Sequence, residues 1–370
     1  MLRQGFDPWP GNCHILRLCK KNCFAEFFAQ CFVKNKQRRC VLQIVDYNSI
    51  VKNAEFFKKK LGNSRLCAVL KNDAYGHGLV RTACALSSVA DFFAVGSVTE
   101  ALKVQPFCPN VLILLPLFCE DVETAVEHNF ILTVDSFETL DRVIGCTPKG
   151  KKARVHLKIE SGMNRLGFEC SQLQRLAEET DNSKISVEGV FSHFYGETEQ
   201  SCNIQLKKFN DAADFLAEQN PNLIRHVANT SAVLLGKKYF LDMARIGLGL
   251  YGYGAPELIP AKTVTAKVIA LRKVRKGEAV SYGGKRLSYD ASLAVLNCGY
   301  ANGFSRALRG ACVKIGGKLC PVVGNVCMAM TMVDVSNVNV AIGDSAILLG
   351  DGVNNSNENV IVYEMLCNLH

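Results

Sequence analysis

Polar side chains stand at the ends of several short apolar runs in this sequence. Lys71 directly follows the run at 66–70. His193 follows a later run at 187–191, and Arg245 lies inside another. A lysine at the end of a buried strand is costly unless it is paired or used covalently. Because the carboxyl ends of parallel barrel strands meet at one rim, we expect these side chains to converge on a functional site there, with Lys71 as the candidate for covalent chemistry.

Each of these residues also has an ordinary structural interpretation. A single lysine at a strand end is most often a solvated rim residue, and a lone histidine such as His193 is more often structural than catalytic. Arg165 also fits a surface ion pair, and Gly247 and Gly249 fit a turn or a close packing contact. Only the convergence of several such groups at one rim favours the functional interpretation.

The apolar runs alternate with amphipathic stretches between about residues 41 and 253. Short buried strands that alternate with helices predict a parallel sheet with right-handed crossovers. Eight such strands close a (β/α)8 barrel. We therefore predict a TIM-type barrel over residues 41–253. The eight runs are 66–70, 92–96, 111–115, 131–134, 155–159, 187–191, 224–228 and 243–250.

The pattern changes after Gly254, where strand-like segments follow one another with glycine-rich turns instead of helices between them. This spacing predicts a separate, mostly antiparallel β domain over residues 254–370. The expected strands are 264–274, 292–297, 311–315, 321–326, 331–335 and 345–349.

Residues 1–40 differ in composition from the rest of the chain. They contain eight Lys and Arg residues against Asp7 and Glu26, so they carry +6 of the formal net charge of +9. We interpret them as a solvated extension, with disorder or an upstream start codon as explanations, and a nucleic-acid-binding arm as the less favoured alternative. Glu26 and Gln30 interrupt the apolar stretch that a signal peptide would need.

The seventeen cysteines are scattered, without a Cys-x-x-Cys pair or a Cys/His cluster at zinc spacing. They are typical of small buried side chains in a reducing cytosol rather than of a disulfide framework. No run of about 18 apolar residues predicts a transmembrane helix. We expect a cytoplasmic protein with no metal site and neither a membrane nor a nucleic-acid partner.

Nine motifs spread over roughly residues 42–367 occur in one characteristic order. With them the chain resembles the alanine racemases, whose pyridoxal-phosphate barrel of fold type III is followed by a C-terminal β domain. A single short motif would be weak, but nine in order are highly specific. The motifs are Ala68–Gly78, Val155–Gly167, Phe191–Phe194, His226–Thr230, Arg245–Leu248, Val280–Gly283, Gly299–Gly303, Gly324–Met328 and Tyr363-Glu364.

The resemblance implies that Lys71 holds pyridoxal phosphate covalently and that Arg245 faces its pyridine nitrogen, with His193 bracing Arg245. A permanently charged guanidinium would keep that nitrogen unprotonated and restrain the ring as an electron sink. The other implied cofactor-binding positions, most of them around the phosphate, are Tyr75, Asn229, Thr230, Gly247, Leu248 and Tyr363.

The resemblance also implies a two-base racemisation in which Lys71 serves one face of the substrate and Tyr282 the other. Family members take this tyrosine from a partner subunit, which implies a homodimer with shared sites. Amines and phenols ordinarily titrate near pH 10, so both groups need a lowered pKa. The implied substrate-binding residues are Arg165, Tyr300 and Met328, and Lys158 lies where many members carry a carbamylated lysine.

The function implied is interconversion of L-alanine and D-alanine, supplying D-alanine for peptidoglycan. A broad-specificity or serine racemase is an alternative, since few pocket residues separate these activities. Basic-amino-acid decarboxylases usually place a carboxylate at the pyridine nitrogen, so Arg245 argues against them. A pyridoxal-phosphate-binding homologue with impaired catalysis is a further alternative, against which the Tyr282 motif argues.

Three departures from the family pattern bear on that last alternative. Asn302 and Ala329 both stand where the family usually has Asp, and the chain stops soon after Tyr363, so we expect an incomplete last strand. Glu160-Ser161 replaces the commoner Asp-Thr pair and is conservative.

Ala329 gives a first prediction. In the family the carboxylate at this position lies near the catalytic tyrosine, so its absence is expected to lower kcat or to shift its pH dependence. Restoring it with Ala329→Asp should raise kcat or move the pH profile of racemisation, measured with the two variants side by side. An unchanged kcat with an unchanged profile would show that Ala329 does not affect Tyr282.

Overall fold

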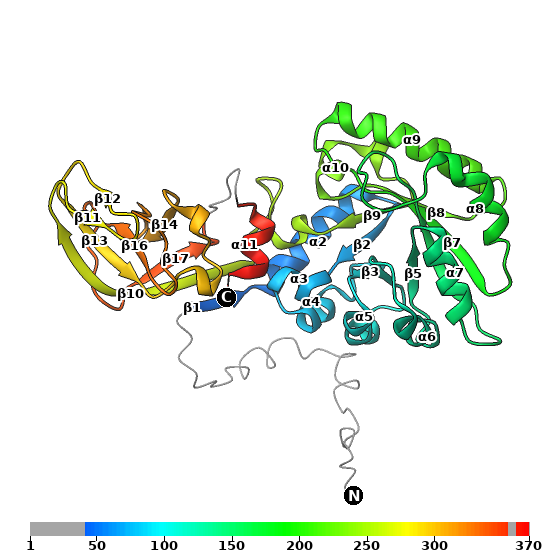
Figure 1. Ribbon diagram of the computed structural model, residues 1–370, viewed down its shortest axis with the longest axis horizontal. Helices are drawn as coiled ribbons and strands as arrows, with labels where there is room; N and C mark the ends of the chain where they lie inside the picture. Colours follow the sequence, from blue (N-terminus) through cyan, green and yellow to red (C-terminus); the bar gives the residue numbers. More distant parts are fainter. Residues whose placement is uncertain (1–40, 354–359, 370) are drawn as a thin grey trace, which may run out of the picture. The chain divides into compact units, whose positions relative to one another are not determined.

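The computed structural model describes residues 41–353 and 360–369. The predicted extension at 1–40 lies outside the described residues. The described part contains a parallel barrel, followed along the chain by an antiparallel sheet (Figure 1). Within it, no helix combines the length and the apolar character that crossing a membrane would require.

Eight parallel strands form the barrel, in the order β8-β7-β6-β5-β4-β3-β2-β9. Hydrogen bonds from Asp242 N to Arg225 O (3.1 Å) and from Arg245 N to Ala228 O (3.0 Å) join the two end strands, so the barrel is nearly closed. The fold class expected from the eight apolar runs is thereby confirmed. The strands are β2 (Arg65–Val69), β3 (Phe92–Val95), β4 (Val111–Ile113), β5 (Ile131–Val134), β6 (Ala153–Lys158), β7 (Ile185–Phe191), β8 (Ile224–His226) and β9 (Met243–Ile246).

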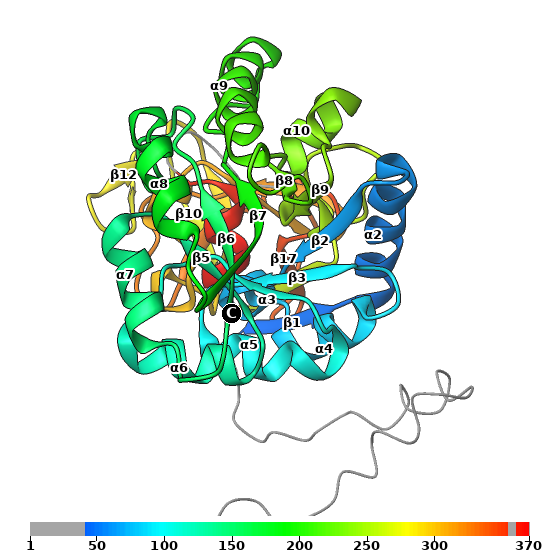
Figure 2. The same ribbon diagram turned by 90° about the vertical axis from the view of Figure 1, so that its right-hand side faces the viewer.

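Helices surround these strands (Figure 2). Polar residues begin several of them, as Ser97 does for α5 and Ser136 for α7, where each hydroxyl accepts a backbone N–H of the first turn. The helices of this part are α2 (Tyr47–Leu61), α3 (Lys71–Gly76), α4 (Leu79–Leu86), α5 (Val98–Val104), α6 (Cys119–Glu127), α7 (Phe137–Cys146), α8 (Leu173–Thr180), α9 (Glu199–Ala217) and α10 (Thr230–Leu235), with short 3-10 helices η2 (Gln105–Phe107), η3 (Cys170–Gln172), η4 (Lys237–Tyr239) and η5 (Leu248–Tyr251).

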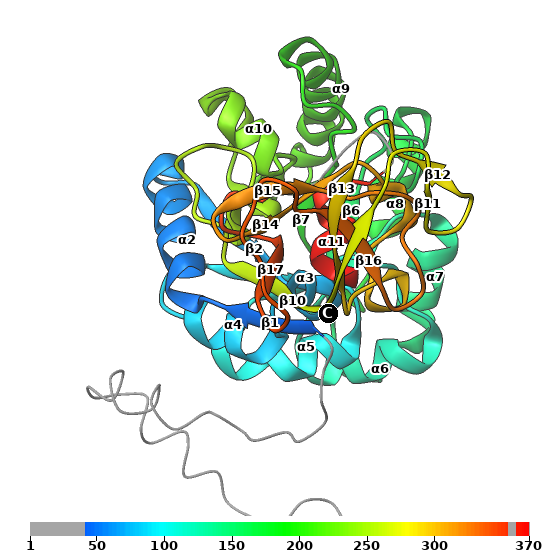
Figure 3. The ribbon, with the colours of Figure 1, turned by 90° about the vertical axis from the view of Figure 1, so that its left-hand side faces the viewer.

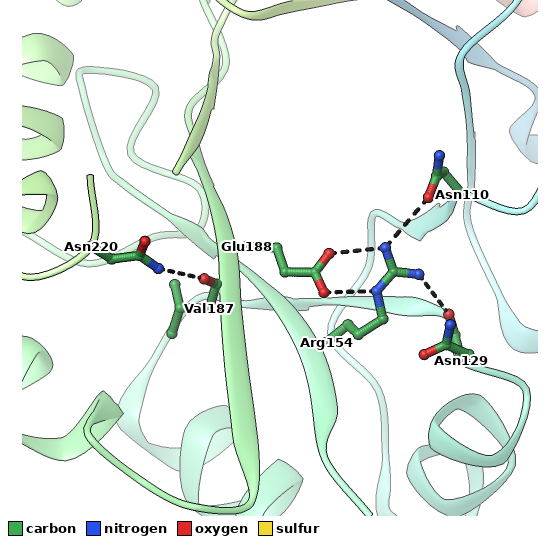
Figure 4. A network of polar contacts seen from close by, with 6 residues as sticks. All are labelled: Asn110, Asn129, Arg154, Val187, Glu188 and Asn220. Atoms are coloured by element: carbon green, nitrogen blue, oxygen red, sulfur yellow. Dashed lines mark hydrogen bonds and ion pairs between the residues drawn. The ribbon is translucent and has the colours of Figure 1, made fainter. Parts of the chain in front are cut away.

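A polar network lies at the amino-terminal ends of the strands, opposite the rim expected to carry chemistry (Figure 4). The Arg154 guanidinium forms a bidentate pair with Glu188 at 2.8 and 2.9 Å and also donates to Asn129 O (3.1 Å) and Asn110 Oδ1 (3.4 Å). Glu188 lies where the register between β6 and β7 shifts. A bidentate pair forms only when the guanidinium and the carboxylate lie in a defined relative orientation. This pair therefore stabilises the shifted register between β6 and β7.

The second sheet is antiparallel, with the order β15-β14-β17-β10-β13-β16 and β1 paired to β10 (Figure 3). Its strands are β1 (Val41–Val45), β10 (Lys262–Val274), β13 (Ala291–Leu296), β14 (Cys312–Ile315), β15 (Lys318–Pro321), β16 (Thr331–Asp334) and β17 (Ser345–Leu349), beside the small hairpin of β11 (Ala279–Val280) and β12 (Lys285–Arg286), the 3-10 helices η6 (Tyr300–Asn302) and η7 (Arg306–Leu308), and the helix α11 (Val362–Asn368).

Three segments differ from the sequence interpretation. Strand β1, assigned to the barrel, pairs with β10, and its alternation of buried and exposed side chains is typical of an antiparallel sheet with one solvated face. The strand expected at 321–326 lies at Lys318–Pro321 instead, followed by an isolated bridge between Val322 and Val333. Residues 362–368 form a helix where we expected an incomplete strand, because Val362, Met365 and Leu366 bury one helical face. The boundary at 253/254 stays a prediction.

Asn53 on α2 holds the segment that leads from the barrel to the second sheet. Its side chain is 2% exposed. Its Nδ2 donates to Leu250 O (3.0 Å) and Ile259 O (2.9 Å), and its Oδ1 accepts from Ile259 N (2.9 Å). One side chain thus satisfies three backbone groups, of which Leu250 O is buried and the two of Ile259 are partly buried.

The change Asn53→Ala should lower the free energy of unfolding by about 1–3 kcal/mol, because it leaves these buried and partly buried backbone groups without partners. Chemical denaturation monitored by circular dichroism measures this loss. Asn48→Ala removes an exposed side chain from the same helix and serves as the control, with an expected change within about 0.5 kcal/mol. Equal effects of the two changes would contradict the role given to Asn53.

Candidate active site

Lys71 lies at the carboxyl end of β2, as the first residue of α3. The four residues after it, Asn72 to Tyr75, all have left-handed backbone angles, with φ between 53° and 54°. Each non-glycine residue in this conformation costs about 1–2 kcal/mol. Asn and Asp tolerate it better than most residues, but Ala74 and Tyr75 do not. Surrounding contacts must therefore hold the turn that carries Lys71 and Tyr75.

Hydrogen bonds from three directions hold this left-handed turn. Glu100 Oε1 accepts from Asp73 N (3.1 Å), and Asp73 Oδ1 accepts from Leu79 N (2.7 Å). Below the turn, His77 Nδ1 contacts Ala74 O (2.9 Å) and Tyr75 O (3.0 Å), and therefore carries the proton. The strained turn is therefore held by hydrogen bonds with Glu100 at the rim, with the start of α4 and with the His77 side chain.

Arg245 on β9 is buried, with 4% of its surface exposed, in the interior of the barrel. Its Nη1 contacts His226 Nδ1 at 2.7 Å, and its Nη2 donates to Ser192 O at 2.6 Å and contacts His193 Nδ1 at 3.3 Å. The guanidinium also lies over the Phe191 ring, 5.3 Å from its centroid. Burial lowers the pKa of Arg245 to about 10, which still leaves it charged at neutral pH. The predicted bracing by His193 is present, and His226 forms the shorter contact.

Two buried histidines continue from Arg245 away from the rim. His226 Nδ1 accepts from the guanidinium, so its proton is on Nε2 and is donated to His156 Nδ1 at 2.9 Å. The proton of His156 is then on Nε2, which has no hydrogen-bond partner within the described residues and packs against Gly189, where a Cβ would come within 2.8 Å. The chain of bonds therefore assigns both histidines as neutral, which leaves the positive charge on Arg245.

Burial and neighbouring cations together lower the pKa values of the basic groups at the mouth of the barrel. Burial lowers the pKa of Lys71, and the charges of Arg165 and Arg245 lower it further. Burial and the charge of Arg165 lower the pKa of Lys158 to about 8, and burial with the charge of Arg245 lowers that of His193 to about 3. A desolvated amine with a lowered pKa is a better nucleophile and base near neutral pH. An anion bound here would relieve the mutual repulsion.

Arg165 itself is exposed and follows Asn164, which has a left-handed φ of 52°. Its backbone N–H lies 3.4 Å from Glu160 Oε2, and Glu160 also accepts from Gly162 N. Burial raises the pKa of this carboxyl, but the backbone hydrogen bonds outweigh it and hold the pKa below its ordinary value. Glu160 thus shapes the loop that presents Arg165 at the rim.

A second group of predicted residues meets between β9 and α10. A Cβ at Gly247 would come within 2.6 Å of Tyr75 Oη, so only glycine leaves room there. Thr230 Oγ1 accepts from Gly249 N (3.1 Å), and Asn229 caps α10 by accepting from Ala232 N (3.0 Å). The short helix η5 begins at Leu248, where the first backbone N–H groups have no partner inside the helix.

Tyr363 on α11 completes this group, because its ring lies 5.7 Å from that of Tyr75, centroid to centroid. Two phenol groups, a threonine hydroxyl and the backbone N–H of Leu248 at a helix start form an arrangement suited to a phosphate. The structure therefore brings together Tyr75, Asn229, Thr230, Gly247, Leu248 and Tyr363 near Lys71. These residues fit an anionic phosphate-bearing cofactor, and the cations Lys71, Arg165 and Arg245, which lower the pKa values of neighbouring basic groups, fit the same molecule.

The remaining predicted residues form a separate cluster on the second sheet. Tyr282, Met328 and Tyr300 are 73%, 60% and 43% exposed. Asn325 Nδ2 donates to Tyr282 O (2.8 Å), and Tyr300 N donates to Cys327 O (3.0 Å), so the loops that carry them are tied together. Within residues 41–353 and 360–369, no hydrogen bond or ring contact joins this cluster to the barrel residues.

Asn302 keeps a structural role that an aspartate could also fill. Its Oδ1 accepts from Gly299 N at 3.2 Å and closes the turn that presents Tyr300. A carboxylate oxygen could accept the same bond, so this contact does not depend on the departure from Asp. Ala329 lies beside Met328 and is exposed, and no contact in the structure shows what its side chain does.

Sequence reasoning gave no role to several polar residues of the site. His226 and His156 each lie within one of the nine motifs, but neither motif indicates a contact with Arg245. A histidine in an apolar strand is a weak signal by itself, because many are satisfied core residues. The register of β6, β7 and β8 brings the two together, and sequence spacing alone does not fix that register.

The two parts of the chain match known families over nearly all of the described residues. Residues 45–255 match the family described as "Alanine racemase, N-terminal domain", and residues 261–370 match "Alanine racemase, C-terminal domain". The alanine racemase of Thermodesulfovibrio yellowstonii is 35% identical over 319 residues, which cover 83% of this chain and 86% of that protein. That of Clostridium tetani is 30% identical over 362 residues, covering 90% of this chain and 94% of its own.

Solved structures of alanine racemases are also similar to this chain. The biosynthetic alanine racemase from Pseudomonas aeruginosa superposes with a TM-score of 0.82 at 28% identity, covering 90% of this chain and 97% of that one. An alanine racemase from Clostridium difficile gives a TM-score of 0.79 at 29% identity, covering 90% and 94%.

The buried histidines predict an acid-sensitive fold. Burial lowers the pKa of His77, His156 and His193 to about 3 and holds that of His226 well below its ordinary value. The unfolded chain binds these protons at about pH 6.5 and the folded chain does not, so stability is complete above that pH and falls as the pH drops toward 3. At pH 5 the loss should reach about 2 kcal/mol for each of His77, His156 and His193.

Denaturant unfolding at pH 7 and pH 5 measures this loss, and nitrogen chemical shifts of the imidazoles report the tautomers directly. His156→Leu removes one of these histidines. The difference in the free energy of unfolding between pH 7 and pH 5 should therefore become smaller by the contribution of that one residue. A histidine of this group that titrates above pH 5 in the folded protein would contradict the assignment.

Proposed function

This chain belongs to the alanine racemase family, and we propose that it interconverts L-alanine and D-alanine with pyridoxal phosphate held covalently by Lys71. The observation that carries the proposal is the half-buried amine of Lys71 at the barrel rim, with its pKa lowered by burial and by neighbouring guanidinium groups. Such an amine can act both as a nucleophile toward an aldehyde and as a base. D-alanine, a building block of peptidoglycan, would be the product of biosynthetic value. A cytoplasmic location stays a prediction.

Bound pyridoxal phosphate supplies a conjugated ring that accepts the electron pair left when a proton is removed from Cα of the amino acid. We assign Arg245 to the ring nitrogen, because its neutral histidine partners keep it the charged member of the network. Tyr75, Thr230, Gly247 and Tyr363 are assigned to the phosphate, together with the N–H of Leu248 and the cap at Asn229.

Racemisation requires a base on each face of Cα, and Lys71 provides one of them. We assign the other to Tyr282. Its side chain is 73% exposed on the β11–β12 turn, and Ser281 before it has a left-handed φ of 61° that turns the chain outward. Since nothing in its own chain covers this tyrosine among the described residues, a second copy of the chain is the partner that fits it. We therefore propose a homodimer with two shared sites.

Arg165 is assigned to the substrate carboxylate, with Tyr300 and Met328 of the partner completing a small pocket. Lys158 has no carboxylate within ion-pair distance among the described residues, and its pKa of about 8 leaves part of its amine neutral at physiological pH. A neutral amine adds to carbon dioxide, forming an N–C bond and releasing a proton. The resulting carbamate would place an anion beside Arg165, and we propose this modification for Lys158.

Two single variants test the assignment of the bases. Lys71→Ala should abolish both the visible absorption of the lysine-bound cofactor and the turnover of L- and D-alanine. Tyr282→Phe should retain the absorption and lose about 10²–10⁴-fold in turnover, because it removes one proton-transfer group while leaving the cofactor site intact. Absorption without turnover in the unaltered protein would instead favour a cofactor-binding protein.

Hybrid dimers test the shared site. If Lys71→Ala and Tyr282→Phe chains are unfolded together and refolded at equal concentration, each mixed dimer contains one site with both bases intact. Random pairing should then restore about one quarter of the unaltered activity from two inactive proteins. The mixed dimers can be isolated by placing a different tag on each chain. If these dimers are inactive, Lys71 and Tyr282 do not act across subunits. Tyr289→Phe changes an exposed tyrosine between β12 and β13 whose Oη donates to Asp334 Oδ2 (2.7 Å); it should remain active and serves as the control.

A further inference from the structure

Lys262 is a buried lysine that the assignments above leave without a role. It is the first residue of β10 and is 1% exposed. No carboxylate lies within ion-pair distance of its Nζ among the described residues. A buried cation without an anionic partner is costly, so its presence calls for an explanation.

The acceptors of Lys262 belong to two elements of the cofactor site. Its Nζ donates to Leu366 O at 2.7 Å, in α11, and lies 3.4 Å from Gly76 O, at the end of the left-handed turn. Tyr363 is on that helix, and Lys71 and Tyr75 are on that turn. One side chain therefore bridges the two elements that carry both phenol groups assigned to the phosphate.

Gly76 is a point of close approach between these elements. Its φ is +72°, and a Cβ at this position would come within 2.6 Å of Leu366 O and 3.2 Å of Lys262 Nζ. Gly76 O also accepts from Gln43 Nε2 at 2.6 Å. Gln43 is on β1 and Lys262 on β10, and these strands are paired. Two neighbouring strands of the second sheet thus hold one carbonyl oxygen of the turn.

We propose that Lys262 is a positioning residue that fixes the turn bearing Lys71 and Tyr75 against the helix bearing Tyr363. The left-handed turn cannot rely on its own backbone preference, so a contact at its last carbonyl determines where it lies. This inference rests on the proposed function of Lys71, Tyr75 and Tyr363. It adds a residue of the second sheet to the determinants of cofactor binding in the barrel.

The charge state of Lys262 is compatible with this role. Burial lowers its pKa to about 8, while the nearby Cys367 thiol and Asp73 carboxylate act in the opposite direction. His77, stacked on Tyr251 beneath the turn, is neutral and feels the charge of Lys262. A neutral amine still has two N–H donors, which is the number of carbonyl acceptors present. The bridge therefore persists whether or not the amine is protonated.

The experiment compares cofactor affinity with stability in the full chain. Lys262→Met keeps the length of the side chain and removes its donors and its buried charge. We expect the dissociation constant of pyridoxal phosphate, titrated into apoprotein by absorbance, to rise about tenfold or more, because the turn and α11 lose their bridge. The melting temperature of the apoprotein should stay within about 4 °C, because losing a costly buried cation offsets the lost hydrogen bonds.

Lys267→Met is the matched control. Lys267 is exposed on the same strand and donates to Gly343 O (3.0 Å) and Ser345 Oγ (2.9 Å), away from the turn. Its removal should change neither quantity. Gln43→Met removes the other donor to Gly76 O and should also weaken cofactor binding. Because both side chains act on one oxygen, the double variant should deviate from additivity.

The possible results distinguish a failure of the positioning role of Lys262 from a failure of the proposed function. Unchanged cofactor affinity in Lys262→Met, or an affinity loss accompanied by an equivalent loss of stability, overturns the positioning role and leaves the proposed function standing. If the unaltered protein does not bind pyridoxal phosphate through Lys71, the proposed function fails and this inference fails with it. If Lys262→Met does not fold, Gln43→Met decides, and unchanged affinity in that variant counts against the inference.

Discussion

The backbone after Lys71 is the constraint on which the site depends. Four consecutive non-glycine residues adopt left-handed angles that each of them disfavours, so their conformation is imposed by the surroundings. Those surroundings include Glu100 from the barrel, His77 from the turn itself and Gln43 from the second sheet. The position of the reactive amine is therefore a property of both sheets together. A barrel alone would carry the same lysine on a less determined turn.

The second organising feature is the distribution of protons around Arg245. Its interior neighbours are histidines, and the order of their hydrogen bonds requires each to be neutral. Carboxylate partners would neutralise the guanidinium and weaken its influence on whatever lies beside it. Neutral imidazoles instead satisfy its donors while leaving its charge uncompensated. Burial beside Arg245 lowers the pKa values of His156, His193 and His226, and this makes the fold sensitive to acid.

Much of this architecture is visible in the sequence, and the reasons differ from part to part. The barrel strands are short, buried on both faces and separated by helices, so their apolar runs are a strong signal. Lys71 and Arg245 stand out because charged residues are rare in such runs. Strand β1 is not among the predicted strands, and the range 41–253 expected for the barrel includes it, because a five-residue strand does not reveal its partner. The helix at 362–368 was missed because the expectation of a strand took precedence over the spacing of its apolar residues.

Other features have no local signature at all. The left-handed turn cannot be recognised from Ala74 and Tyr75, because nothing in their side chains favours it. The contact of His226 with His156 depends on strand register, and that of Lys262 with Gly76 on the pairing of β1 with β10. Such long-range contacts decide which polar residues are partners, and composition or spacing does not encode them directly.

The division of the predicted residues into a buried barrel cluster and an exposed cluster around Tyr282 has a consequence for how the protein responds to dilution. Each chain holds the full set of groups assigned to the cofactor, so retention of the cofactor would be independent of protein concentration. Proton transfer to the second face would instead follow the monomer–dimer equilibrium. In a dilute solution the two properties would separate, giving a population of chains that is loaded but idle and that becomes active on encounter with a second copy.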